Sequence, residues 1–292
     1  MVNHVVKPLA PGLYFVATPI GTARDITLRG LDILASADVI AAEDTRSMKR
    51  LLEIHGVPLG DRPVLAYHDH NGDKMRPRLL GYLAEGKSVA YASEAGTPLI
   101  ADPGFDLGRV ARAEGYAVTA APGPSAVIDA LTIAGLPTDR FMFAGFLPNA
   151  KNARRAALAE FTDIPATLVF YESPKRIHQM LADAAEVFGS EREAAVCREL
   201  TKKFEECLTG TLGELGQQLS DRTLKGEIVV LISRRDGQGA EMDVEAALRK
   251  ALETMSVRDA SEAVAAASGE KKRKIYQLAL ELQGGKEKKG QI

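Results

Sequence analysis

The chain has 292 residues, 46% of them hydrophobic and 26% charged, a balance that excludes a disordered or fibrous protein and suggests about two domains with a small appendage. No apolar run reaches the roughly 18 residues needed to cross a bilayer, and the first residues resemble no export signal, so we expect a cytoplasmic protein. The net charge is −2, from 37 basic and 39 acidic residues, and this near-balance conceals a basic C-terminal segment.

One pattern repeats through the first 146 residues: a short apolar run, a loop rich in Gly, Pro, Ser and Asp, and a helical stretch. Apolar runs without polar alternation are typical of buried strands, and their alternation with helices predicts a parallel sheet with helices on both faces. The predicted strands are residues 13–17, 39–42, 64–67, 89–92, 118–120 and 141–146. The predicted helices are residues 28–37, 48–55, 77–85, 107–114 and 126–134.

A different pattern begins after residue 146. Three apolar runs lie close together with only one helical stretch among them, which favours antiparallel pairing, so we predict a second α/β domain with a mixed sheet. Its predicted strands are residues 167–171, 194–198, 205–209 and 227–232, and its predicted helices are 151–160, 176–188 and 212–219. The two α/β domains are therefore predicted to span residues 1–146 and 147–235.

Residues 240–285 are predicted to form a separate helical module after a linker at residues 234–239. Its predicted helices are residues 244–254, 257–267 and 271–282, with Ser256 at the first break. Segment 271–292 has seven basic and two acidic residues, which gives it a charge of +5 and leaves −7 on the rest of the chain. This pattern fits a helix-turn-helix-like module that binds a polyanion, and a solvated chain end is the commoner alternative.

Polar and glycine-rich loops follow five predicted strands of the first domain. Because the carboxyl ends of parallel strands meet at one edge of a sheet, we expect these loops to form one rim. Glycines let backbone amides approach a ligand closely and prolines fix the shape of a loop, so the rim favours a small-molecule pocket over five unrelated turns. The loops are residues 18–21, 43–46, 68–71, 93–98 and 121–125.

Several common sites are absent from the sequence. It has no phosphate-binding P-loop motif, no G-x-G-x-x-G after the first strand and no G-x-S-x-G elbow, which disfavours P-loop enzymes, nicotinamide dehydrogenases and acyl-transfer enzymes. Cys197 and Cys207 are too few for a disulfide framework or a four-cysteine metal site. His68 and His70 on a strand end point to opposite sides, so we expect them to form hydrogen bonds or contact substrate, with no bound metal.

An ordered series of motifs resembles one known family. From Leu13 to Leu282 the motifs are TPIG followed by DIT, then AEDTR, YHDHN, AGTPLIADPG, PGPSA, GLPTDRF, GFLP, FYESPKR, RELTK and KGEI. The series is similar to that of the 2′-O-ribose methyltransferases that modify a decoding-centre cytidine of small-subunit (16S) ribosomal RNA, in the tetrapyrrole (precorrin/corrin) methylase superfamily. The resemblance implies a two-domain tetrapyrrole-methylase-like fold, S-adenosylmethionine (SAM) in the cleft between the domains, and a homodimer.

The resemblance also implies a cofactor site, position by position. Its residues are Ile20, Glu94, Ala95, Gly96, Thr97, Pro124, Ser125 and Tyr171. An adenosine and a zwitterionic methionine need backbone amides, one or two hydroxyls and an apolar floor, and these residues supply all three. The alternatives are that Ile20 is only a core residue and that Ser125 is only a helix N-cap.

Methyl transfer to a ribose hydroxyl needs an acceptor for the hydroxyl proton and cations that hold phosphates. The candidate catalytic residues are polar rim residues and one residue of the second domain: Glu43, Asp44, Arg46, His68, Asp69, His70 and Glu172. The candidate RNA-binding residues are Lys175, Arg176, Arg198, Lys202, Lys271, Lys272, Arg273 and Lys274. The alternative is that Asp44–Arg46 and Arg198–Glu199 are local ion pairs that only shape their loops.

The chain departs from the family pattern at four positions. Thr22, Glu94, Ala144 and Lys175 stand where Asn, Asp, Glu and His are common. Lys175 therefore excludes a histidine general base at that position.

The basic tail favours RNA over a tetrapyrrole as substrate, because a small-molecule methylase does not need such a module. Two other functions stay open: a methylase of the same superfamily acting on a tetrapyrrole or corrin intermediate, and a non-catalytic nucleic-acid-binding protein that uses the pocket as a sensor.

Overall fold

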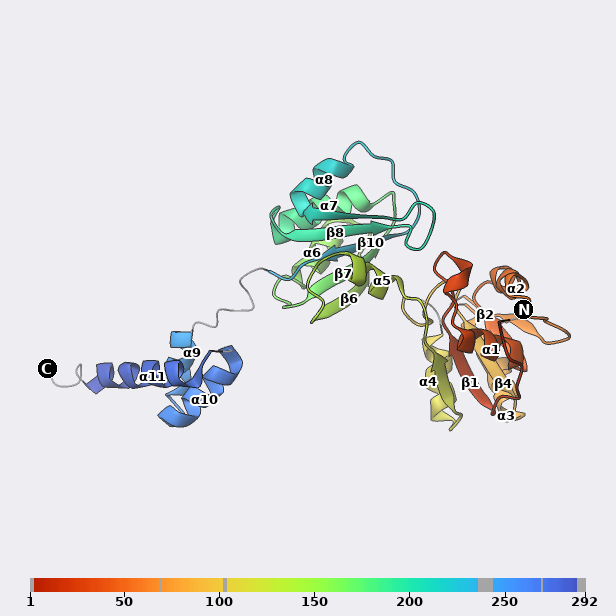
Figure 1. Ribbon diagram of the computed structural model, residues 1–292, viewed down its shortest axis with the longest axis horizontal. Helices are drawn as coiled ribbons and strands as arrows, with labels where there is room; N and C mark the ends of the chain where they lie inside the picture. The colour runs from red at the N-terminus through yellow and green to blue at the C-terminus, as the bar shows by residue number, and fades with distance from the viewer. Residues whose placement is uncertain (1–2, 69, 102–103, 236–243, 269, 288–292) are drawn as a thin grey trace. The chain divides into compact units, whose positions relative to one another are not determined.

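The computed structural model describes residues 3–68, 70–101, 104–235, 244–268 and 270–287 (Figure 1). By its contacts the chain divides into two compact units, one formed by Met1–Thr162 with Thr167–Ile232 and the other by Asp163–Ala166 with Ser233–Ile292. Every helix within the described ranges is too short or too polar to span a membrane.

The first sheet is parallel, as predicted, with the strand order β3-β2-β4-β1-β5. Its strands are β1 (Gly12–Val16), β2 (Val39–Ala42), β3 (Val64–Ala66), β4 (Ser88–Ala92) and β5 (Val118–Ala121). Its helices are α1 (Leu28–Ser36), α2 (Thr45–Ile54), α3 (Gly72–Ala84) and α4 (Phe105–Ala113), and a short 3-10 helix, η1, spans Ala23–Asp25. β4 is buried along its whole length, because α1 and α2 pack in one apolar cluster and α3 and α4 in another.

The second sheet is mixed, as predicted, with the order β6-β7-β10-β8-β9. Its strands are β6 (Phe141–Phe146), β7 (Thr167–Glu172), β8 (Glu193–Arg198), β9 (Glu206–Thr211) and β10 (Ile228–Ile232). Its helices are α6 (Lys151–Ala159), α7 (Ile177–Phe188) and α8 (Leu212–Leu219). β10 is antiparallel to both β7 and β8, so the start of β10 lies beside the end of β7.

The prediction that residues 141–146 form the last strand of the first sheet is wrong. That segment is β6 of the second sheet and pairs with β7 in parallel. The preceding helix α5 (Ala126–Ile133) also packs on the second sheet, because Val127 and Leu131 share an apolar cluster with Val169 of β7 and Val229 of β10. The chain therefore changes sheets after β5, about 20 residues before the predicted boundary, since an apolar strand carries no signal of which sheet it joins.

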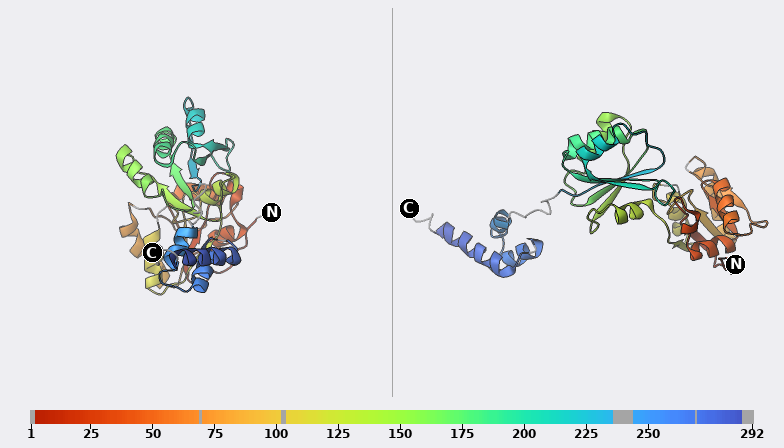
Figure 2. Two further views of the ribbon diagram at one scale, coloured as in Figure 1. Left: turned by 90° about the vertical axis from the view of Figure 1, so that its left-hand side faces the viewer. Right: turned by 45° about the horizontal axis from the view of Figure 1, so that its top comes forward.

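The described residues of the second unit form three helices, as predicted: α9 (Val244–Ala251), α10 (Val257–Ser268) and α11 (Lys272–Glu287) (Figure 2). Their apolar faces meet in a small core built on Leu248, Val264 and Ile275. Ser256 lies at the predicted break, where its hydroxyl accepts a hydrogen bond from the Asp259 amide at 3.2 Å. Most of the predicted linker lies beyond Arg235, outside the described residues.

Candidate functional site

Hydrogen bonds join the loops that follow three strands of the first sheet. The amide of Thr18 donates to the carbonyl of Gly96, and the amide of Gly96 donates to the carbonyl of Thr18, both at 3.0 Å. The hydroxyl of Thr97 donates to the carbonyl of Pro124 at 2.9 Å. The loops after β1, β4 and β5 therefore form one continuous rim, as the strand order predicts, because β4, β1 and β5 are neighbours in the sheet.

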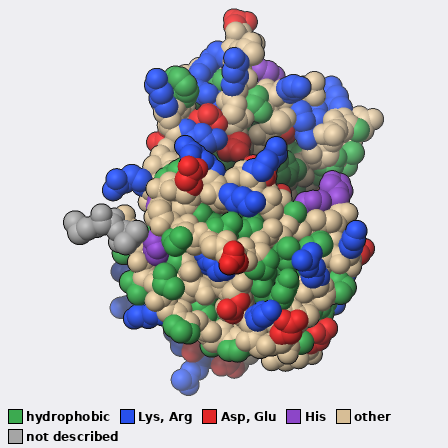
Figure 3. Space-filling view, turned by 90° about the vertical axis from the view of Figure 1, so that its right-hand side faces the viewer, with side chains coloured by type: hydrophobic (Ala, Val, Ile, Leu, Met, Phe, Trp, Pro, Cys, Tyr) green, Lys and Arg blue, Asp and Glu red, His purple; other side chains and the backbone are tan. Residues whose placement is uncertain are grey.

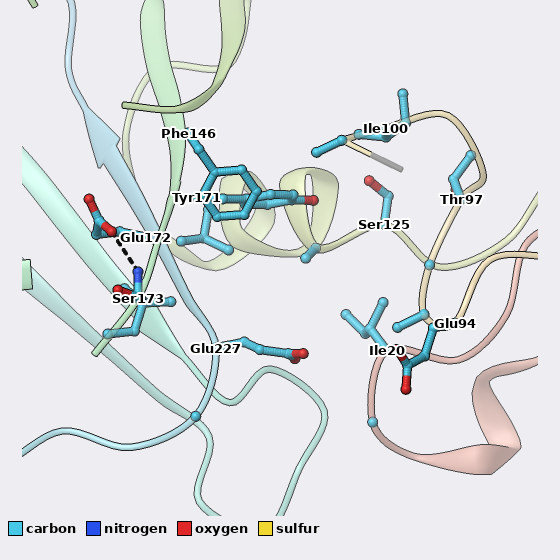
Figure 4. Close-up of a pocket in the computed structure, with 18 of the residues that line it drawn as sticks. Ile20, Glu94, Thr97, Ile100, Ser125, Phe146, Tyr171, Glu172, Ser173 and Glu227 are labelled. Atoms are coloured by element: carbon cyan, nitrogen blue, oxygen red, sulfur yellow. Dashed lines mark hydrogen bonds between the residues drawn. The ribbon is translucent and has the colours of Figure 1, made fainter. Parts of the chain in front are cut away.

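A cavity of about 630 Å³ opens at this rim, a volume within the range of small-molecule sites (Figure 4). Its walls come from the loops of the first sheet and from the adjoining ends of β6, β7 and β10 in the second sheet. Besides the predicted residues, the walls contain Pro19, Gly21, Ser47, Ile100, Ala101, Ala126, Phe146, Ser173, Pro174, Gly226, Glu227, Ile228 and Val229.

Most of the residues predicted for a cofactor site lie in the walls of this cavity. They are Ile20, Glu94, Ala95, Gly96, Thr97, Ser125 and Tyr171, while Pro124 borders the cavity through its bond to Thr97. Ile20 is both a wall residue and part of the core, with 8% of its surface exposed. Ser125 occupies the N-cap position of α5, but its side chain makes no capping hydrogen bond and points toward the Tyr171 hydroxyl in Figure 4.

Two of the predicted catalytic residues, Glu43 and Glu172, line the cavity. The Glu43 carboxylate accepts a hydrogen bond from the Glu94 amide at 3.2 Å, which holds it at the rim. The Glu172 carboxylate turns back to accept from the Ser173 amide at 2.7 Å and lies 3.3 Å from the Arg176 guanidinium, and its other oxygen is buried without a partner among the described residues.

The other predicted catalytic residues lie outside the cavity walls. Asp44 is the N-cap of α2 and accepts from the Arg46 amide at 2.7 Å, so the local-pair alternative describes its contacts. Hydrogen bonds from the Arg46 side chain and amide hold the pKa of Asp44 below its ordinary value. The His68 and His70 rings lie 6.1 Å apart, and the described residues contain no group of three or more side chains that suits a metal. Asp69 lies outside the described residues.

Three of the four predicted RNA-binding residues of the first unit already have partners. Arg176 donates to the carbonyl of Leu147 at 2.6 Å, and Arg198 pairs with Glu206 rather than with Glu199. Lys175 instead lines a second cavity of about 320 Å³ together with His178 and Arg222. Of the four, Lys175 is therefore the one whose charge has no ion-pair partner in the described part of the chain.

Lys202 joins the end of β8 to the start of β10. Its ammonium donates to Glu199 at 2.9 Å and to Glu227 at 2.8 Å. Partial burial lowers the pKa of Lys202, but the two carboxylates outweigh this effect and hold it above its ordinary value. Because Glu227 lines the cavity, Lys202 acts on the site by holding this carboxylate.

Residues 12–216 match the family of tetrapyrrole (corrin/porphyrin) methylases. The chain belongs to this family. Residues 238–283 match a second family, described as the RsmI C-terminal HTH domain. Two solved structures share the methylase fold: a cobalt precorrin-4 methyltransferase (TM-score 0.56, 17% identity, 76% of this chain and 94% of that chain) and a diphthine synthase (TM-score 0.58, 18% identity, 76% of this chain and 89% of that chain).

Curated relatives match this tetrapyrrole methylase over nearly its whole length. A protein from Mesorhizobium japonicum is 45% identical over 278 residues, 94% of each chain. A second from Vibrio cholerae is 42% identical and covers 96% of this chain and 98% of its own, and a third from Escherichia coli O157:H7 is 41% identical with 93% and 96% covered. All three are named ribosomal RNA small subunit methyltransferase I.

The cavity of this methylase fits SAM in its chemistry. SAM carries a sulfonium and an ammonium besides its carboxylate, and four glutamates line the walls: Glu43, Glu94, Glu172 and Glu227. Glu172 and Glu227 already pair with Arg176 and Lys202, whereas Glu43 and Glu94 form no ion pair in the described part of the chain. The buried Glu172 oxygen without a partner marks a place where the wall lacks a hydrogen-bond donor. The side chains of Ile20 and Tyr171 supply apolar surface for an adenine, and the glycine at position 96 leaves the backbone open to a ligand.

Thr22, a departure from the family pattern, connects the first loop to the loop after β8. Its hydroxyl donates to the carbonyl of Thr201 at 2.5 Å, and its amide donates to the Thr201 hydroxyl at 3.1 Å. Thr201 has a left-handed φ of 62°, which an unbranched or Asn residue adopts more readily, so these bonds hold a strained residue. A Cβ at neighbouring Gly21 would lie 2.6 Å from the Thr201 hydroxyl, so this close approach needs glycine.

We expect Thr22→Val to lower the free energy of unfolding by about 0.5–1.5 kcal/mol, because the variant loses the bond to the Thr201 carbonyl. Urea denaturation measures the change. Thr132→Val is the control, since the Thr132 hydroxyl donates to the Ile128 carbonyl within the same helix, α5, at 2.8 Å, and the urea midpoint of this variant should barely move. Equal midpoints for Thr22→Val and the wild type would show that the contact contributes nothing.

Several wall residues were missed by reasoning from the sequence. Gly226, Glu227 and Ile228 belong to the KGEI motif that supports the resemblance, but a rule about the carboxyl ends of strands does not find them. They reach the cavity because β10 is antiparallel, so that its first residue, Ile228, pairs with Glu172, the last residue of β7. The sequence analysis predicts antiparallel pairing among β8, β9 and β10, but it does not predict the pairing of β10 with β7 that brings these residues to the cavity.

Proposed function

We propose that this protein is a SAM-dependent methyltransferase of 16S ribosomal RNA that methylates the ribose 2′-hydroxyl of a cytidine in the decoding centre. The observation that carries the proposal is the similarity to proteins named ribosomal RNA small subunit methyltransferase I, which extends over more than nine-tenths of the chain and includes the C-terminal module. A methylase of small tetrapyrroles has no evident use for such a module. The proposed partner is the small ribosomal subunit, and the proposed state is a cytoplasmic homodimer.

SAM supplies a methyl group on a positively charged sulfur when it is bound. The chain must then hold the ribose hydroxyl beside this group and accept the hydroxyl proton as the new bond forms. Among the candidate catalytic residues we favour Glu43 as the acceptor, because its carboxylate lines the cavity and is held by the Glu94 amide. Glu172 is the second choice, because Arg176 and the Ser173 amide already hold one of its two carboxylate oxygens and the other is buried.

The RNA is proposed to contact Lys175 beside the cavity and the basic residues of the C-terminal module. Lys271 and Arg273 are exposed and have no ion-pair partner in the described part of the chain, whereas Lys272 pairs with Glu262 and Lys274 with Glu270. On the face drawn in Figure 3, basic and acidic side chains are interspersed. This face therefore has no continuous positive patch that would attract a polyanion.

Incubation with methyl-labelled SAM tests the proposal against its alternatives. The substrates are small subunits from a strain that lacks the corresponding enzyme, naked 16S ribosomal RNA, and a precorrin. We expect label in the ribosomal RNA, in a 2′-O-methylcytidine that resists alkaline hydrolysis and maps to the decoding centre. Label in the precorrin alone would support the tetrapyrrole alternative. Tight binding of SAM and RNA without transfer would support the non-catalytic alternative.

A further inference from the structure

Strand β6 contains a β-bulge at its cavity end. Along the β6–β7 pair, Phe143 lies opposite Val169, but the next partners are Gly145 opposite Phe170 and Phe146 opposite Tyr171, so β6 has one extra residue. Gly145 makes this possible with a left-handed φ of 69°. Residues opposite each other in paired strands share a face, so the extra residue turns Phe146 to the face of Tyr171. Without it, Gly145 would lie there.

The Phe146 ring is held at the mouth of the cavity with much of its surface free. Its centroid lies 5.5 Å from that of Tyr171 in an edge-on contact, and Phe143 contacts Tyr171 in the same way at 4.8 Å (Figure 4). Phe146 lines the cavity and yet is 60% exposed. A single exposed apolar residue is ordinary on a protein surface. Here, however, a β-bulge directs the exposed ring into the cavity, and bulges are common next to active sites, where they direct a side chain. We therefore expect the ring to contact a ligand.

A planar aromatic group is the ligand that suits this ring. The SAM adenine is a poor match, because a bound cofactor is usually 70–90% buried, whereas this ring lies at the open lip. Of the residues implied for SAM that Figure 4 labels, Ile20, Glu94, Thr97 and Ser125 lie across the cavity from Phe146, and Tyr171 lies beside its ring. A base of a large RNA reaches the lip from outside, and proteins commonly hold unstacked RNA bases on aromatic side chains.

We propose, on the basis of the proposed RNA methyltransferase function, that the target nucleobase leaves the RNA stack and lies on the ring of Phe146. The contact positions the attached ribose so that its 2′-hydroxyl enters the cavity near Glu43. The ring has no hydrogen-bonding group, so it fixes the place of the base and does not distinguish cytosine from another base. Phe146 is thus a substrate-positioning residue of the reaction.

Kinetics of Phe146 variants on small subunits test the proposal. For Phe146→Ala we expect kcat/KM to fall by about tenfold or more with SAM affinity unchanged in calorimetry, and Phe146→Trp should restore most of the loss. Phe141→Ala is the matched control, because Phe141 is an exposed phenylalanine of the same strand that does not line the cavity. Wild-type kinetics for Phe146→Ala, or a loss of SAM affinity in it, would overturn the proposal.

A second readout uses the fact that the chain contains no tryptophan. Phe146→Trp therefore places the chain's single tryptophan at the lip. We expect 16S ribosomal RNA to quench the tryptophan emission by stacking, and S-adenosylhomocysteine alone to leave it unchanged. Quenching by S-adenosylhomocysteine alone would assign the ring to the cofactor adenine and overturn the proposal. The wild-type protein tests the proposed function by itself. If it does not methylate RNA, both the proposed function and this contact are overturned, whereas a contrary result confined to the Phe146 variants overturns only the contact.

Discussion

Replacing Gly96 with valine is expected to weaken SAM binding by at least about 100-fold while the protein still folds. Gly96 has a left-handed φ of 83°, and a Cβ added there would lie 3.3 Å from Cγ2 of Ile20, tighter than an ordinary contact. The branched side chain would fill the backbone's approach to the ligand and push the loop away from the carbonyl of Thr18. Calorimetric titration with SAM measures the loss, and Gly96→Ala should be intermediate.

Gly115→Val is the control that distinguishes a blocked cavity from backbone strain as the cause of weaker SAM binding. Gly115 has nearly the same φ, 84°, but a Cβ there meets no atom within 4 Å, and the residue lies outside the cavity walls. Its variant should lose stability through strain and bind SAM normally. Normal binding by a folded Gly96→Val would remove the loop after β4 from the cofactor site.

The elements of the fold were predictable because most of them follow one strong periodic signal. Residues 39–42 and 212–219 were predicted at their observed bounds, and several other elements differ by a residue at an end. The error over β6 has a different origin, since α5 and β6 are apolar enough to pack on either sheet. Which sheet they join is decided by contacts with Val169 and Val229, far away along the chain.

The cavity was predictable where it depends on local sequence and unpredictable where it depends on pairing. The loops with Gly96 and Ser125 follow strands of a parallel sheet, so one rule finds them together. Arg176 shows the limit of reasoning from charge: its guanidinium suits a phosphate, but it binds the carbonyl of Leu147 and faces Glu172. The sequence also does not predict that Phe146 lines the cavity, because the β-bulge that places it there is a property of the β6–β7 pair and not of β6 alone.

Ending the chain at Arg235 is expected to leave SAM binding nearly unchanged and to slow methylation of small subunits by roughly 10- to 100-fold at sub-saturating substrate. SAM binding should persist because the residues that line the cavity lie between Pro19 and Val229, in the first compact unit. The rate should fall because the truncated chain lacks α9, α10 and α11 with their exposed cations. Circular dichroism and SAM titration must accompany the assay, since misfolding would also lower the rate.

Charge substitutions within the module show whether its cations carry the effect. Lys271→Gln with Arg273→Gln should reduce the log–log salt dependence of RNA binding by about 0.7–0.9 for each phosphate that the variant no longer neutralises. Lys272→Gln with Lys274→Gln should reduce the salt dependence less, because those ammonium groups already pair with Glu262 and Glu270, although such exposed pairs are weak and can exchange for phosphate.

If the chain ending at Arg235 methylates small subunits as fast as the full chain, the module does not hold the RNA. Its basic residues are then a solvated chain end, and the RNA must be bound beside the cavity, where Lys175 has no partner for its charge in the described part of the chain.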